Sequence, residues 1–192
     1  KWMPESEVVL IAKQKPEEAG KRLHAAELIF CVDFNSLNRL KGMEQAVRLS
    51  KAPKILIDHH EKPEDFSDYM WSEPGACSAA ELVFKFLKKL DNDKFITTNV
   101  LNCLYTGILT DSMGFSIGNA TAQTHRIVAE LIDMGASYRE IHTHIYNTNS
   151  LDRIRFIGFC LTEKLFLIIE LRNIWFFTDH NKLFQRATSL YF

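Results

Sequence analysis

Three short apolar runs mark the first third of the chain, at residues 8–11, 28–32 and 55–57. Continuous apolar runs are typical of parallel strands that are buried on both faces. The stretches between them, residues 16–26 and 40–50, are charged and compatible with helices. This alternation predicts an α/β fold, a three-layer, doubly wound and mostly parallel sheet.

The rest of the chain has a helical pattern as far as residue 164. Start and stop signals predict five helices, at residues 78–90, 97–110, 121–134, from 137 onward and 150–164. The last 27 residues, 166–192, contain no glycine or proline and show no clean periodicity. We therefore predict a domain over residues 1–165 and a divergent tail over residues 166–192.

Charge and hydropathy narrow the class of protein. The 23 basic residues nearly balance the 24 acidic residues, so no strong field of one sign attracts long nucleic acids or anionic membranes. No apolar run reaches the roughly 20 residues of a membrane-spanning helix. The first residues also lack the pattern of a signal peptide. We expect a soluble cytoplasmic protein with no membrane partner.

Acidic residues and histidines follow the predicted strands. Asp33 comes directly after one apolar run, and Asp58-His59-His60 follows another. Both carboxylates should lie at the carboxyl edge of a parallel sheet, where Asp111, from the end of a predicted helix, could join them. Carboxylate and imidazole together suit Mn²⁺, Mg²⁺ or Fe²⁺. A single Asp after a strand is more often a cap or turn residue, but three such acids beside a His-His pair favour a metal site.

Four segments carry a resemblance to a known family. They are LIFCVDFN at 28–35, ILIDHH at 55–60, EPGACSAAE at 73–81 and TGILTD at 106–111. Their order resembles that of the DHH phosphoesterase superfamily. Over residues 1–165 the chain looks most similar to the branch of bifunctional oligoribonucleases (nanoRNases) and 3′,5′-bisphosphate nucleotide (pAp) phosphatases, which is related to RecJ-like exonucleases.

The resemblance implies a role for each site residue. Asp33 would bridge two divalent metal ions, Mn²⁺ in the first place with Mg²⁺ as the alternative. His59 would ligate one ion, and Asp111 would complete its shell. His60 would face the substrate phosphate, while Asp58 would orient a histidine and fix its tautomer. The implied reaction is attack of a metal-bridging hydroxide on a short RNA or nucleotide substrate.

Two departures from the family leave alternatives open. The 192 residues contain neither the family's first metal motif, a His-x-x-Pro-Asp-x-Asp-like segment, nor its C-terminal Gly-Gly-Gly-His-like motif. We therefore expect an N-terminally truncated DHH domain with an exposed sheet edge and apolar face. A homodimer is a further expectation, because family members often pair through this core. The alternatives are a hydrolase of pyrophosphate, polyphosphate or cyclic dinucleotides, and a catalytically dead remnant that keeps the fold.

Overall fold

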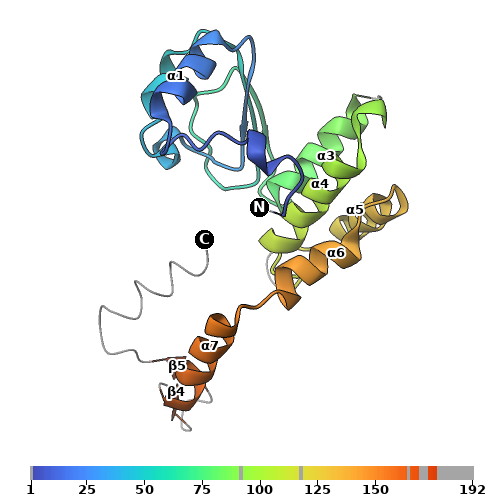
Figure 1. The fold of residues 1–192 in the computed structure, drawn as a ribbon. Helices are drawn as coiled ribbons and strands as arrows, with labels where there is room; N and C mark the ends of the chain where they lie inside the picture. The colour runs from blue at the N-terminus through green and yellow to red at the C-terminus, as the bar shows by residue number, and fades with distance from the viewer. Residues whose placement is uncertain (1, 91–92, 117–118, 164, 169–172, 177–192) are drawn as a thin grey trace. The chain divides into compact units, whose positions relative to one another are not determined.

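The computed structural model describes residues 2–90, 93–116, 119–163, 165–168 and 173–176. Contacts divide the chain into two compact units, Lys1–Ile141 and His142–Phe192. Figure 1 shows the chain as a ribbon coloured from the N-terminus to the C-terminus. The domain boundary that the sequence predicts at residue 165 remains a prediction.

Three parallel strands form the sheet of the first unit. They are β1 (Ile29–Val32), β2 (Lys54–Asp58) and β3 (Tyr69–Ser72), in the order β1-β2-β3. The mixed α/β class with a parallel sheet is thus confirmed. The strand β3 was not predicted, because its sequence YMWS follows a charged loop and is flanked by no apolar run.

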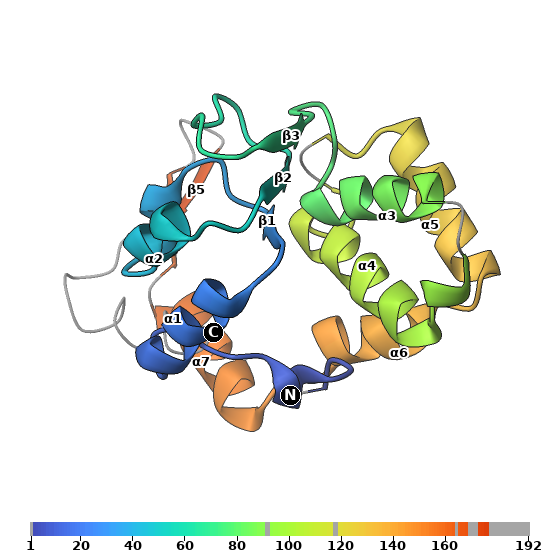
Figure 2. The ribbon, with the colours of Figure 1, turned by 90° about the horizontal axis from the view of Figure 1, so that it is seen from above.

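Helices cover both faces of this sheet (Figure 2). On one side lie α1 (Pro16–Ala25), the 3₁₀ turn η2 (Leu37–Leu40) and α2 (Glu44–Leu49). On the other side α3 (Ala79–Lys89) packs against β2. The first face encloses a buried cluster built around Ile29, Cys31, Leu37, Val47, Ala52 and Leu56, and the second a smaller one built around Ile57, Ala76 and Leu82. Three layers result.

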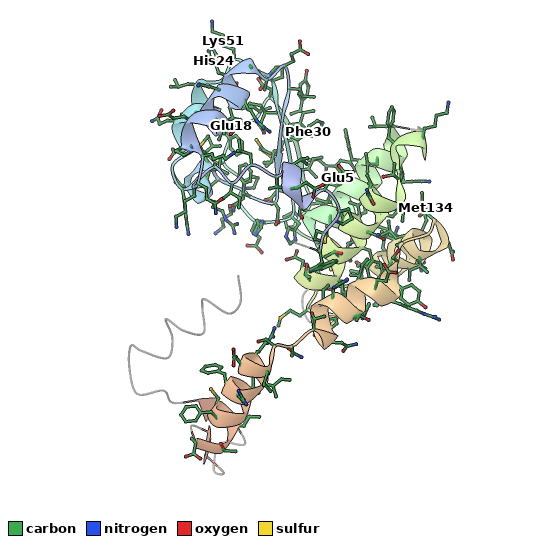
Figure 3. All side chains as sticks on the ribbon, in the orientation of Figure 1. Glu5, Glu18, His24, Phe30, Lys51 and Met134 are labelled. Atoms are coloured by element: carbon green, nitrogen blue, oxygen red, sulfur yellow. The ribbon has the colours of Figure 1, made fainter. Side chains whose placement is uncertain are left out.

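The predicted strand at residues 8–11 is wrong. Residues Ser6–Val8 form a 3₁₀ turn, η1, and both Val8 and Val9 are exposed. An apolar run becomes a strand only where a neighbouring strand satisfies its backbone groups, and among the described residues β1 pairs with β2 alone. On its other side β1 has no partner among the described strands, which agrees with the sheet edge that the sequence predicts. Phe30 (Figure 3) and Val32 are 47% and 38% exposed. The Phe30 ring meets the ring of Phe86, on α3, edge to face.

Side-chain caps position the helices that follow. After the short turn η3 (Asp93–Phe95) come α4 (Thr98–Asp111) and α5 (Ala122–Asp133), whose N-caps Thr97 and Thr121 accept backbone hydrogen bonds as predicted. Helices α3 and α4 approach closely at Gly107, where an added Cβ would lie 2.7 Å from the Cβ of Ala80. That approach brings the end of α4 to the carboxyl edge of the sheet. The helix α6 (Tyr138–His142) ends the series.

The second unit contains the π-helical turn η4 (Thr143–Asn147) and the helix α7 (Leu151–Glu163). Ser150 caps α7 as predicted, since its Oγ accepts from the Arg153 N–H at 3.2 Å. The strands β4 (Leu165–Ile168) and β5 (Asn173–Phe176) pair antiparallel, in a tail for which the sequence predicted no structure. The remaining residues of the tail lie outside the described part of the chain. None of the described helices is long and apolar enough to span a membrane.

Candidate metal centre

The two strand ends bring two acids to one edge of the sheet. Asp58 is the last residue of β2, and Asp33 follows β1 directly. The Asp33 N–H still donates to the Ile57 carbonyl, at 3.2 Å, so the ladder continues to this residue. Asp33 has φ +67°, a left-handed backbone that Asp tolerates better than most residues. The turn places its carboxylate at the strand end.

His59 lies between two carboxylates. Its Nε2 is 3.2 Å from Asp111 Oδ2 and 3.5 Å from Asp33 Oδ1. Its Nδ1 is 3.3 Å from the Ala76 carbonyl oxygen. A carbonyl only accepts hydrogen bonds, so Nδ1 must carry the proton of this bond, and the neutral ring then presents a lone pair at Nε2. Asp111, the last residue of α4, reaches this point from the other side of the site.

This donor set suits a divalent cation. Two carboxylates and an imidazole lone pair repel one another unless a positive charge, either a proton or a cation, lies among them. Ligand atoms of Asp33, His59 and His60 all lie within 4.8 Å of one another. Carboxylate oxygens suit both Mn²⁺ and Mg²⁺, and imidazole nitrogen is a ligand of transition-metal ions. The residues therefore fit a metal ion of the kind that the sequence predicts.

The electrostatics of Asp33 agree with this fit. Partial burial raises the pKa of the Asp33 carboxyl, and the negative charge of Asp111 raises this pKa further. The charges of His59 and His60 act in the opposite direction. A bound cation would favour the ionised carboxylates in the same way, and more strongly.

His60 is held in a different way from His59. Its Nδ1 is 2.8 Å from Asp58 Oδ1, and its backbone N–H donates to Asp58 Oδ2 at 3.1 Å. Asp58 is fully buried, so its carboxylate depends on protein donors such as these. The two imidazole rings meet edge to face, with centroids 4.7 Å apart. Asp58 thus fixes the His60 ring by one nitrogen and leaves Nε2 as the nitrogen that can meet a ligand.

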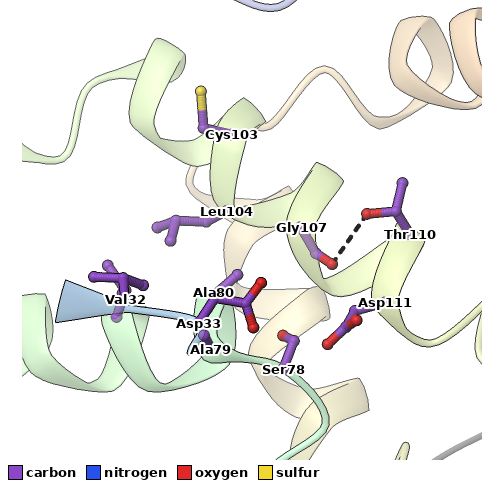
Figure 4. A pocket seen from close by; sticks show the side chains of 11 residues that line it. Val32, Asp33, Ser78, Ala79, Ala80, Cys103, Leu104, Gly107, Thr110 and Asp111 are labelled. Atoms are coloured by element: carbon purple, nitrogen blue, oxygen red, sulfur yellow. Dashed lines mark hydrogen bonds between the residues drawn. The ribbon is translucent and has the colours of Figure 1, made fainter. Parts of the chain in front are cut away.

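A hollow of about 330 Å³ adjoins these groups. The Asp33 and Asp111 carboxylates lie on its wall, and Ser78 is beside them (Figure 4). Val32, Val83 and Leu104 add apolar surface. The site therefore opens into a space with a charged end and an apolar wall.

The structure brings together all five residues that the sequence singles out, and adds others that it did not. Asp33, His59 and Asp111 converge on one point, while Asp58 and His60 form the adjoining pair. Sequence reasoning missed the Ala76 carbonyl, because a backbone acceptor has no side-chain signature. It assigned His60 to catalysis, which stays a prediction, and it gave no sign that this ring also lies close to Asp33 and His59.

Loops after the strands are tied to each other beside the site. Asn35 Nδ2 donates to the Glu61 carbonyl at 2.8 Å. Glu64 accepts from the Ser36 hydroxyl at 2.9 Å and from the Leu37 N–H at 3.0 Å. These bonds hold the segment after His60 against the segment after Asp33.

Comparison with known proteins places the chain among related sequences. Residues 1–108, more than half of the chain, match the DHH family, N-terminal domain. The chain is 23% identical over 165 residues to the bifunctional oligoribonuclease and PAP phosphatase NrnA of Bacillus subtilis, covering 81% of this chain and 51% of that relative. It is 30% identical over 113 residues to an uncharacterized protein of Mycoplasma pneumoniae, covering 59% of this chain and 34% of that relative.

The fold also matches a solved structure. The crystal structure of an exopolyphosphatase-related protein from Bacteroides fragilis superposes with a TM-score of 0.83 at 35% sequence identity. The match covers 87% of this chain and 49% of that protein. The chain therefore spans about a third to a half of the length of these relatives.

Proposed function

The chain belongs to the DHH family, and we propose that it is the metal-binding part of a phosphoesterase that hydrolyses short oligoribonucleotides and 3′,5′-bisphosphate nucleotides such as pAp. One observation carries the proposal: the convergence of Asp33, His59 and Asp111 beside the Asp58–His60 pair. Members of this family are generally dependent on divalent metal ions, and the acidic and histidine groups here offer a site for one.

Three residues would hold the metal. His59 would use Nε2, because its Nδ1 proton is engaged by the Ala76 carbonyl, and Asp111 and Asp33 would each supply a carboxylate oxygen. Asp33 is the carboxylate that two ions would share, with Mn²⁺ the first candidate and Mg²⁺ the second. Divalent cations bound there would activate water and neutralise charge on the phosphate during hydrolysis.

His60 would act on the phosphate directly. With Nδ1 held by Asp58, its Nε2 is directed away from that carboxylate, and a protonated ring would donate a hydrogen bond from Nε2 to a phosphate oxygen or a proton to the leaving oxygen. Asp58 stabilises the protonated ring and fixes its orientation, as a carboxylate commonly does for a histidine at an active site.

The substrate class follows from the relatives and from charge. The Bacillus subtilis relative is named as an oligoribonuclease and PAP phosphatase. Long nucleic acids need many Lys and Arg contacts to phosphate, and the net charge of this chain is only −1. Short, phosphate-rich substrates suit that balance.

A second candidate is the hydrolysis of polyphosphate or pyrophosphate. The Bacteroides fragilis protein that shares this fold is described as exopolyphosphatase-related, at 35% identity. The metal and histidine chemistry would be the same. Only the group on the far side of the scissile phosphate would differ, so the two candidates separate by substrate.

The test is hydrolysis by the purified chain with Mn²⁺ or Mg²⁺. The substrates are pAp, a short RNA oligomer, polyphosphate and pyrophosphate. Because the family's first metal motif has no counterpart in the 192 residues, a fusion that places such a motif before Lys1 is assayed in parallel. The variant His60→Ala removes the proposed phosphate-facing group, and His24→Ala on α1 is the matched control, an exposed histidine outside the site.

We expect release of mononucleotides by the fusion, abolished in His60→Ala and unchanged in His24→Ala. Turnover of polyphosphate alone would favour the second candidate. A fusion that binds Mn²⁺ but hydrolyses none of these substrates would contradict both candidates.

A further inference from the structure

A buried carboxylate lies behind the candidate site, on the first turn of α3. Glu81 has only 3% of its side chain exposed. An unpaired buried charge is strongly unfavourable, so the partners of Glu81 show what it holds. It accepts from the Cys77 N–H at 3.3 Å and from the Thr124 hydroxyl at 2.8 Å, and it pairs with Lys85 Nζ at 2.9 Å.

These bonds depart from an ordinary helix cap. Ser78 caps α3 by accepting from the Glu81 N–H, so a capping box would send the Glu81 carboxylate back to the N–H of Ser78. Glu81 instead reaches one residue further, to Cys77. The carboxylate therefore fixes the loop before the helix in addition to the helix end.

Thr124 provides a second anchor for this carboxylate. It is fully buried on α5, and its hydroxyl oxygen accepts from the Thr121 N–H at 3.2 Å. The Thr124 hydroxyl can therefore donate its one proton in the hydrogen bond to Glu81. The N-terminus of α5 fixes the position of this hydroxyl. Glu81 is held from α5 while it holds the loop before α3.

The same loop is fixed at its other end. Lys85 also pairs with Glu73, at 3.2 Å. Burial lowers the pKa of the Lys85 ammonium, but the hydrogen bonds that it donates to Glu81 and Glu73 outweigh this effect, so the pKa is raised. The Glu73 N–H donates to the Asp58 carbonyl at 3.0 Å. Residues 73–77 are therefore held at both ends, and Ala76 lies between these anchors.

Ala76 is the residue whose carbonyl accepts from His59 Nδ1. We propose that Glu81 is a positioning residue of the metal centre. By holding the Cys77 N–H, Glu81 keeps the Ala76 carbonyl where it accepts the hydrogen bond from His59 Nδ1. That bond orients the ring so that Nε2 points toward Asp33 and Asp111. The chain of contacts runs from α5 through Glu81, Cys77 and Ala76 to His59. Backbone partners of metal-bound histidines set ring orientation and affinity in this way.

This inference deepens the proposed function, and its first readout does not depend on it. In the intact chain, labelled with ¹⁵N-histidine, we expect the His59 Nδ1 proton to exchange slowly with water, both without metal and with Mg²⁺. In Glu81→Met the loop loses its anchor, so we expect that proton to exchange rapidly and Mn²⁺ to bind roughly 10-fold more weakly.

Two further variants separate positioning from general stability. Glu81→Gln keeps an oxygen that can accept from Cys77, so it should retain the slow proton. Glu81→Asp keeps the charge but is one methylene too short to reach Cys77, and it carries the test if the Met variant does not fold. Thr124→Val removes the bond from α5 and leaves the Cys77 bond, so the His59 Nδ1 proton should exchange faster than in the wild type but more slowly than in Glu81→Met.

A folded Glu81→Asp or Glu81→Met protein that keeps the slow His59 proton and full Mn²⁺ affinity would overturn the proposal. The proposal would also be overturned if Thr124→Val lost as much Mn²⁺ affinity and exchanged the His59 proton as fast as Glu81→Met, because both effects would then reflect a general loss of stability. A wild-type chain that shows the slow proton but binds no Mn²⁺ would support the link from Glu81 to His59 and contradict the proposed function.

Discussion

Two neighbouring strands each lead to an Asp at the same edge of the sheet, but the two carboxylates differ in burial. Both β1 and β2 are apolar runs followed by Asp, yet the side chain of Asp33 is 59% exposed and that of Asp58 is fully buried. Asp33 turns toward His59 and Asp111 in a left-handed backbone. Asp58 stays in the strand and accepts two hydrogen bonds from His60.

The place of each strand in the sheet explains the difference. β2 has neighbours on both sides, and helices cover both of its faces, so its terminal carboxylate is enclosed and needs internal partners. β1 pairs on one side only among the described residues, and its outward side chains are half exposed. At the edge of the sheet the Asp33 carboxylate stays available to a ligand, whereas in the centre the Asp58 carboxylate orients His60.

Exchanging each acid for its amide gives the largest expected contrast. Asp58→Asn leaves one of the two His60 donors facing an NH₂ group, so we expect a stability loss of about 1–3 kcal/mol. In the fusion protein with the upstream metal motif, the same change should lower the rate of hydrolysis roughly 10- to 100-fold, because His60 loses its orientation. Asp33→Asn should change stability by less than about 0.5 kcal/mol, as at most exposed sites. Urea melts and initial rates measure both, and equal stability losses would contradict the comparison.

The two faces of β1 provide the next contrast. Cys31 is 2% exposed and Val32 is 38% exposed, although the residues are adjacent. Cys31→Ser buries a hydroxyl without an assigned partner and should cost about 1–3 kcal/mol. Val32→Thr on the outer face should cost less than about 1 kcal/mol, because its hydroxyl can meet water. Thermal melts of the two variants decide, and a larger loss at Val32 would show that this face is covered in solution.

The backbone of Asp33 predicts a smaller effect. Its φ of +67° is strained for residues with a Cβ, and Gly adopts it at no steric cost. Asp33→Gly should therefore be more stable than Asp33→Ala by about 0.5–1 kcal/mol, although both lose the carboxylate. Chemical denaturation of the two variants measures the difference. An alanine variant as stable as the glycine variant would indicate that the backbone relaxes out of this conformation.

The smallest effect concerns the bonds that tie the two strand ends together. Hydrogen bonds from Arg48, then from Ser36 and from the Leu37 N–H, lower the pKa of Glu64 from its ordinary value of 4.5. A lowered acid pKa stabilises the fold above 4.5, and that contribution is lost as the pH falls through the lowered value. The Tm of the wild type should exceed that of Glu64→Gln at pH 7, and the gap should close in acid. A Tm difference that grows as the pH falls would contradict this prediction.

The sequence predicted which candidate site residues lie together better than it predicted their surroundings, for physical reasons. Asp33, the segment Asp58–His60 and Asp111 carry side-chain chemistry at element ends, where pattern alone locates them. The strand β3 escaped prediction, because its pairing depends on β2 and on no local signal. The run at residues 8–11 has the composition of a strand but pairs with none of the described strands.

The supports of the site were harder to predict. The segment EPGACSAAE at 73–81 was recognised as part of a family pattern, but the contribution of Ala76 is a backbone carbonyl. The contribution of Glu81 depends on Thr124, 43 residues away in the sequence. Contacts of this kind are set by the packing of α3 against its neighbours, which no local pattern encodes.

The most direct test of the central claim is Mn²⁺ binding followed by electron paramagnetic resonance. The wild-type chain is titrated beside Asp33→Asn, Asp111→Asn and the control Asp133→Asn, an exposed acid on α5. We expect the two site variants to weaken binding by more than roughly 100-fold, since loss of a direct ligand should exceed the 10- to 100-fold effect of a supporting residue. The control should bind as the wild type does. Equal Mn²⁺ affinity in all four proteins would contradict a metal centre at the ends of β1, β2 and α4.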